Sequence, residues 1–164
     1  VLGKVIGGGM PLAAFGAKRS VMEHLAPQGS VYQAGTLSGN PVATACGLTT
    51  LKVISEPGFY EALNLKTTSL ISGLKKVARS HGHNLCGDSE GGMFGFFMLP
   101  TLPQNYKDVL KTDSSAFNTL FHGLLERGIY IAPALYEAGF VSSAHSDEDI
   151  EATIFAADEV FRTM

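Results

Sequence analysis

The stretch VLGKVIGGGMP, at residues 1–11, decides how the rest of the chain is interpreted. It sets one cation, Lys4, in an apolar, glycine-rich run that contains no acidic residue. Burial there would favour the neutral amine over the ammonium ion, and a neutral amine is the nucleophile that condenses with a carbonyl. The glycines allow a bulky group to approach the backbone closely. By itself the run leaves two interpretations open, a reactive amine and an ordinary lysine at the end of a strand.

Residues 1–11 are expected to form a buried strand that leads into a glycine-rich turn. Only three residues precede Lys4. We therefore expect that the chain has been cut from a longer protein and that part of its site lies upstream.

The composition excludes several classes of protein. Of the 164 residues, 45% are hydrophobic and 16% are charged, which is typical of a globular domain and not of a disordered chain. The net charge is −3 and no basic run exceeds two residues, so we expect no nucleic-acid partner. The apolar run at residues 93–99 is too short for a membrane span. Cys46 and Cys86 fit neither a disulfide framework nor a metal site, and indicate reduced, packed thiols.

A domain boundary is predicted at Glu56-Pro57-Gly58, which interrupts the helical pattern. Before it, we expect a short helix at residues 20–25 and a helix at 41–54 that is capped by Asn40. After it, we expect a long helix that ends near Gly82 and then two strands, at 84–87 and 92–99, around a turn at 88–91. An irregular stretch at 99–111 should precede a helix capped by Ser114. Strands at 129–132 and 140–143 and a final helix capped by Ser146 complete the expected elements. This order predicts the end of an α/β domain in residues 1–55 and a small α+β domain in residues 56–164.

The loop GTLSGNP, at residues 35–41, is the second candidate for chemistry. It offers backbone amides, two hydroxyl groups and an amide side chain just before a helix N-terminus, which suits a phosphate. A polar loop that only caps a helix remains the alternative. Together with the amine of Lys4, however, a phosphate seat is what a pyridoxal phosphate enzyme requires.

Three segments together resemble the class-III aminotransferase family. Residues 2–16 resemble its lysine segment, and residues 32–41 resemble its phosphate loop. The run YEAGFVSSAH, at residues 136–145, resembles one branch in particular, the aminomutases. The likeness extends over the whole chain.

The resemblance implies the fold-type-I architecture of pyridoxal-phosphate-dependent transferases. In that α/β fold, a large domain with a seven-stranded sheet is followed by a C-terminal α+β domain. Residues 1–55 would be the C-terminal end of the large cofactor-binding domain, and residues 56–164 the complete small domain.

The resemblance also implies roles for four residues. Lys4 would form the Schiff base with pyridoxal 5'-phosphate and shuttle protons between cofactor and substrate. Thr36 would hold the cofactor phosphate of a neighbouring subunit, with Gly35 allowing the close approach, so a homodimer with shared sites is expected. Glu137 would hold the substrate's ammonium group, although a solvated glutamate before a glycine turn is an alternative. No metal is implied.

The implied activity is an intramolecular amino transfer that converts glutamate-1-semialdehyde to 5-aminolevulinate, in the biosynthesis of tetrapyrroles, with the pyridoxamine phosphate form of the cofactor in the cycle. Two alternatives remain: an ω-aminotransferase that needs a keto acid, and an inert C-terminal module. The aspartate and the stacking aromatic ring that the resemblance implies would lie upstream, so we expect the chain alone to be inactive. The expected location is the cytoplasm, or the plastid in a plant or alga.

Overall fold

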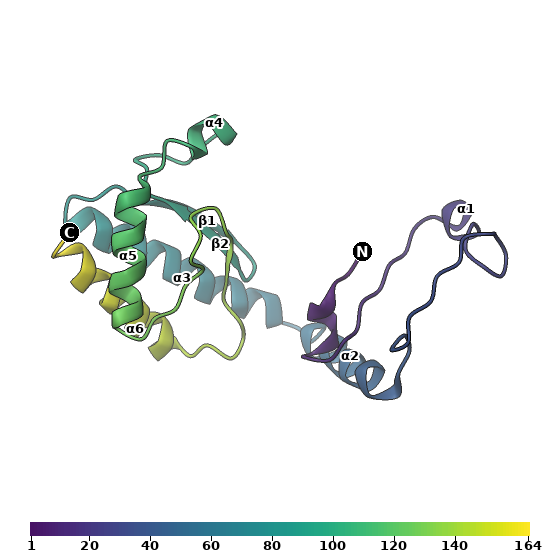
Figure 1. The fold of residues 1–164 in the computed structure, drawn as a ribbon. Coiled ribbons are helices and arrows are strands. Elements are labelled where there is room, and N and C mark those ends of the chain that lie inside the picture. Colours follow the sequence, from purple (N-terminus) through teal and green to yellow (C-terminus); the bar gives the residue numbers. More distant parts are fainter. The chain divides into compact units, whose positions relative to one another are not determined.

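The computed structural model describes all residues from Val1 to Met164 and divides into two compact units, Val1–Pro57 (unit 1) and Gly58–Met164 (unit 2) (Figure 1). The division falls between Pro57 and Gly58, inside the segment Glu56-Pro57-Gly58.

Unit 1 has little regular structure. Its elements are η1 (Lys4–Gly7), α1 (Arg19–Met22) and α2 (Pro41–Ile54). The prediction of a strand at residues 1–11 is wrong, because η1 is a turn of 3-10 helix and Leu2 forms only an isolated antiparallel bridge with Ala14. Gly8 and Gly9 account for the difference, since their φ angles of 57° and 93° turn the chain where a strand would have to continue.

Helix α2 begins where the sequence predicted. The side chain of Asn40 accepts a hydrogen bond from the amide of Ala43 at 2.9 Å, and Pro41 occupies the first helical position. Most of the helix surface is exposed, and only Ala43 and Gly47 are buried along its length.

Unit 2 is a small α+β layer. Its elements are α3 (Phe59–Ser80), β1 (Cys86–Glu90), β2 (Met93–Phe97), α4 (Tyr106–Val109), α5 (Ser114–Glu126), β3 (Gly139–Phe140) and α6 (Asp147–Phe161). The three strands form one antiparallel sheet in the order β1-β2-β3, with Glu90 opposite Met93 and Met93 opposite Phe140.

The hairpin of β1 and β2 differs from the expected one. Residues 88–90 belong to β1 and not to the turn, because Gly91, at a φ of 56°, lets the chain reverse within two residues. Residues 129–132 form no strand, and Ile129 and Ile131 instead pack their side chains against the core.

Two helices of unit 2 also differ in detail. Helix α5 is capped by Asp113, whose carboxylate accepts a hydrogen bond from Ala116 N at 3.0 Å, and not by Ser114. The short helix α4 lies where an irregular stretch was expected. At α6, Ser146 and Asp149 form the reciprocal capping box, which confirms the predicted cap.

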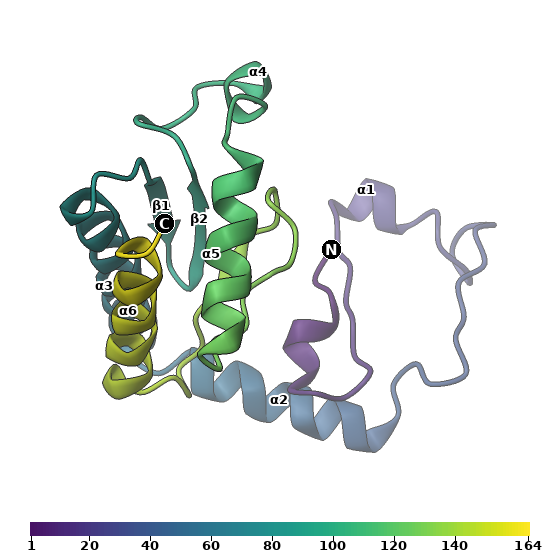
Figure 2. The ribbon, with the colours of Figure 1, turned by 60° about the vertical axis from the view of Figure 1, so that its left-hand side comes forward.

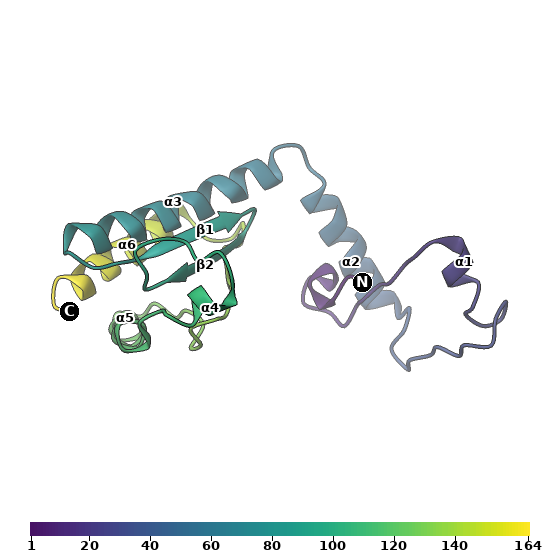
Figure 3. The ribbon, with the colours of Figure 1, turned by 90° about the horizontal axis from the view of Figure 1, so that it is seen from above.

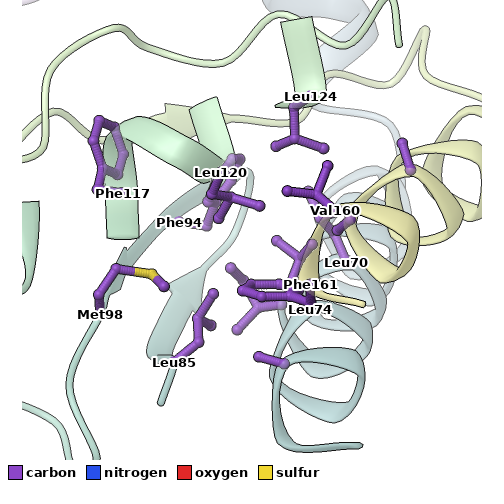
Figure 4. Close-up of a cluster of buried hydrophobic side chains, with 14 of the residues drawn as sticks. Leu70, Leu74, Leu85, Phe94, Met98, Phe117, Leu120, Leu124, Val160 and Phe161 are labelled. Carbon is purple, nitrogen blue, oxygen red and sulfur yellow. The ribbon is translucent and has the colours of Figure 1, made fainter. Parts of the chain in front are cut away.

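The core of unit 2 is built mainly by α3, α5, α6 and β2. Helix α3 packs along α6 and along β1, and α5 packs against α6 (Figures 2 and 3). Figure 4 shows Leu120 of α5 beside Phe94 of β2, with Leu74 of α3 and Phe161 of α6 below them. Alternation along β2 turns Phe94 into this core and leaves Met93, which is 47% exposed, on the opposite face of the sheet.

None of the helices combines the length and the apolar character needed to cross a membrane. No three His, Cys, Asp or Glu side chains gather in a geometry that could hold a metal ion.

Candidate functional site

A cavity of about 500 Å³ in unit 1 brings together two of the segments that the sequence singled out. Lys4, Gly35 and Ser38 all line it. The remaining lining residues are Val1, Pro11, Leu12, Ala13, Ala14, Phe15, Gln33, Leu37 and Gly39. An amine and a loop that lie more than thirty positions apart in the sequence therefore meet at one hollow.

Lys4 is exposed, whereas the sequence predicted a buried amine. The 3-10 turn is the physical reason, because it directs Ile6 and Gly7 inward and leaves Lys4 and Val5 on the outside. Exposure leaves the amine accessible to a ligand that enters the cavity.

The loop before α2 is a tight turn. The amide of Ser38 donates to the carbonyl of Gly35 at 2.9 Å, and a Cβ on Gly35 would lie 2.8 Å from Ser38 Oγ. A side chain at position 35 would therefore need the hydroxyl of exposed Ser38 to rotate aside. The predicted role of Gly35, to let a phosphate approach the backbone closely, stays a prediction.

Thr36 lies on the same loop and is exposed. No hydrogen bond within the chain uses its backbone amide or its hydroxyl, so both are available to a ligand. Thr36 is not among the residues that line the cavity beside Lys4.

Glu137 lies in unit 2, at a separate cavity of about 360 Å³ between the β1–β2 hairpin and residues 135–138. Its side chain is exposed and forms no ion pair, while its amide donates to Ala134 O at 3.1 Å. Apolar residues, among them Met93 and Phe97, form much of the remaining wall.

Two further carboxylates line this cavity, and sequence reasoning missed them. Asp88 and Glu90 were assigned to a turn, but as residues of β1 they are two positions apart and share one face of the sheet. Strand alternation would have revealed them if the hairpin register had been known. No lysine, arginine or histidine lines the cavity.

The buried thiol contributes to neither cavity. Cys86 donates to the carbonyl of Thr101 at 3.2 Å, and burial raises its pKa. This agrees with the prediction that Cys86 is a packed thiol.

The comparisons with known proteins agree with one another on the family. The family model described as "Aminotransferase class-III" matches residues 1–150. The chain is 71% identical, over all of its 164 residues, to the glutamate-1-semialdehyde 2,1-aminomutase of Verminephrobacter eiseniae. It is 72% identical, over 99% of its length, to the protein of the same name from Albidiferax ferrireducens. It spans only 38% and 37% of the lengths of these two relatives.

Solved structures show the same fold. An omega-transaminase from Sphaerobacter thermophilus superposes with a TM-score of 0.82 at 25% identity, covering 98% of the chain and 37% of that protein. A glutamate-1-semialdehyde-aminomutase from Pseudomonas aeruginosa superposes with a TM-score of 0.69 at 18% identity, covering 86% of the chain and 32% of that protein. The chain therefore has part of the fold-type-I transferase architecture, and it belongs to the class-III aminotransferase family.

Proposed function

We propose that the chain supplies the cofactor-attaching lysine and the phosphate loop of an aminomutase that converts glutamate-1-semialdehyde to 5-aminolevulinate. The observation that carries the proposal is the cavity of unit 1, which is lined both by the accessible amine of Lys4 and by residues of the loop before α2. The choice of reaction is supported by the sequence identity of 71% and 72% with two proteins that are named glutamate-1-semialdehyde 2,1-aminomutase.

The chain carries two groups that fit pyridoxal 5'-phosphate. Lys4 provides a primary amine for the aldehyde, and the free amide and hydroxyl of Thr36 provide donors for the phosphate of a neighbouring subunit's cofactor. The loop also leads into the N-terminus of α2, a helix of 14 residues whose dipole favours an anion. When bound, the cofactor supplies an electron sink that stabilises negative charge on the substrate carbon beside the transferred amino group.

The chain's own residues then bind the substrate and move protons. Lys4 Nζ takes a proton from one substrate carbon and returns one to the other. Glu137 holds the substrate's ammonium group, for which its exposed and unpaired carboxylate is suited. Over the whole reaction the C1 aldehyde becomes an aminomethyl group and C2 becomes a ketone, so that no second keto acid is consumed.

We further propose a homodimer with shared active sites and a location in the cytoplasm. Thr36 supports the dimer, because its free donors lie outside the cavity of its own Lys4 and are available to the neighbouring subunit. The family resemblance supports the location.

The decisive experiment uses a full-length chimera, in which residues 1–164 replace the matching segment of the Verminephrobacter eiseniae relative. We expect the chimera to form 5-aminolevulinate without added keto acid. Lys4→Ala should reduce that rate by at least about 10²-fold, since the proton carrier is lost. Lys18→Ala, at another exposed lysine of unit 1, is the matched control. Undiminished product formation by the Lys4→Ala chimera would refute the proposal.

The same assay separates the alternatives. A requirement for a keto acid would indicate an ω-aminotransferase, the activity named for the Sphaerobacter structure. A chimera that folds but is inactive, beside an active parent relative, would indicate a purely structural module.

We also propose that the isolated chain does not hold the cofactor stably. Its Lys4 is exposed, and only four residues of unit 1 are buried to hold the turn that carries it. Mixing the chain with pyridoxal 5'-phosphate and dialysing it should leave no visible absorbance band from lysine-bound cofactor. A band that survives dialysis would contradict this.

A further inference from the structure

The carboxylate of Glu137 is carried by a segment that joins the sheet of unit 2 only two residues further on. Gly139 lies opposite Phe94 in the pairing of β3 with β2. Buried Val141 follows, and its amide donates to Gly92 O at 2.8 Å. Glu137 itself is exposed and forms no ion pair, so the place of its side chain depends on where the sheet holds the backbone.

Gly139 lies directly against a core side chain. A Cβ at position 139 would lie 2.1 Å from Phe94 Cζ, 2.5 Å from Cε2 and 2.6 Å from Cε1, so it would overlap the far end of the ring. The φ angle of Gly139 is not positive, unlike that of Gly91 in the hairpin turn. Position 139 therefore requires glycine for space and not for a left-handed backbone.

The ring of Phe94 has little room to move away. It is 9% exposed, belongs to the buried core and lies beside Leu120 of α5 (Figure 4). In a close-packed core, added atoms force shifts of the backbone or strained side-chain conformations. A methyl group at position 139 would therefore displace the segment from the sheet, and Glu137, two positions away, would move with it.

The same contact determines where the carboxylate lies in its cavity. Phe94, Glu137 and Ala138 all line the cavity of about 360 Å³ described above. Phe94, Glu137 and Gly139 also line a second cavity, of about 210 Å³. Phe94 and Glu137 thus belong to the wall that is common to both cavities, and a shift of the segment changes the position of the carboxylate in each.

We propose that Gly139 is a positioning residue, which sets the place of the Glu137 carboxylate by letting β3 lie directly against Phe94. The proposal rests on the function proposed above, in which Glu137 holds the substrate's ammonium group. A charge-assisted hydrogen bond is short, so a displacement of the carboxylate by about 1 Å weakens it. The loss concerns substrate binding and not proton transfer at Lys4, so it should raise KM and leave kcat nearly unchanged.

The test measures the formation of 5-aminolevulinate by the full-length chimera at a series of glutamate-1-semialdehyde concentrations. Gly139→Ala should raise KM by about tenfold and leave kcat nearly unchanged. Phe94→Leu removes the Cε and Cζ atoms that the new Cβ meets. By itself it leaves a gap beneath Gly139 and should raise KM by a smaller factor, whereas the two substitutions together should restore much of the affinity.

A second comparison separates positioning from a general loss of packing. Glu137→Gln should raise KM by itself, because it removes the charge that binds the ammonium group. Adding Gly139→Ala should then change KM little further, since both substitutions act on the same interaction. Gly73→Ala is the matched control, because a Cβ there would meet Ile154 Cδ1 at 2.3 Å between α3 and α6. It should leave KM unchanged.

Two results would overturn the positioning role and leave the proposed function intact. One is an unchanged KM for Gly139→Ala, and the other is a full effect of Gly139→Ala in the Glu137→Gln chain. If Gly139→Ala prevents folding, as judged by circular dichroism, Phe94→Leu takes its place in the comparison with Glu137→Gln. If Glu137→Gln leaves KM unchanged, the role proposed for Glu137 fails together with this inference, while a rate that still depends on Lys4 preserves the rest of the proposed function.

Discussion

Replacing Leu120 by alanine should destabilise unit 2 more than a change at almost any other position of α5. Leu120 is 0% exposed and lies in the centre of the core, beside Phe94 of β2 (Figure 4). Leu125, on the same helix, is 44% exposed and serves as the matched control.

The expected magnitude follows from these exposures. Removing a fully buried leucine side chain forfeits about 2 kcal/mol of transfer free energy, and the cavity left behind adds to it, so that we expect a total of about 3–4 kcal/mol. Leu125→Ala removes a side chain that is already partly in water and should cost about 1 kcal/mol. For a domain of this size the difference corresponds to a melting temperature lower by roughly 10 °C or more.

Urea unfolding followed by far-ultraviolet circular dichroism measures the effect, and this probe is suitable because the chain contains no tryptophan. The midpoint should fall at constant slope, which identifies a change in stability and not in the extent of unfolding. If Leu120→Ala costs no more than Leu125→Ala, the packing of α5 described above is wrong.

Three other predictions concern caps and titrating groups. Ser146→Ala should lower the free energy of unfolding by about 1 kcal/mol, since it removes the hydroxyl that accepts from Asp149 N at 3.1 Å; urea midpoints measure it, and exposed Ser72→Ala, which should change little, is the control. The amide of Ser146 holds the pKa of Asp149 below its ordinary value. The stability that this provides is therefore present above the unfolded pKa, about 3.9, and is lost as the pH falls through the lower folded pKa. Asp149→Asn should accordingly flatten the decline of the urea midpoint in acid, and an unchanged slope would count against the capping box. Finally, Cys86 should react with iodoacetamide more slowly than half-buried Cys46 in the native chain, because burial raises the pKa of Cys86 and blocks access; equal rates by peptide mass mapping would exclude this.

Local sequence patterns were sufficient to predict many elements of unit 2 and helix α2 of unit 1. Asn40 before Pro41 was sufficient to locate α2, and Ser146 followed by three acidic residues was sufficient to locate α6. Both caps are interactions between residues three positions apart, so a linear sequence contains all the information they need. The chemical types that lead to the proposed site, the amine of Lys4 and the hydroxyl of Thr36, are likewise visible in the sequence.

Local sequence patterns could not predict contacts between residues that lie far apart in the sequence. The sequence could not show that Gly47 of α2 packs against Leu12 and against the carbonyl oxygen of Ile6 in the turn that carries Lys4. Gly47 and Leu12 are 35 positions apart, and their contact depends on the absence of a side chain at position 47. Nor could it show that the hairpin turns at Gly91, so that Asp88 in β1 and Glu137 line the same cavity. Sequence alone thus determined the family and the caps of α2 and α6, and it predicted the reactive groups, since each depends on residue type and short spacing. Tertiary structure alone decided the exposure of the amine, its common cavity with the loop and the register of the sheet, because these are set by packing between segments that the chain brings together only on folding.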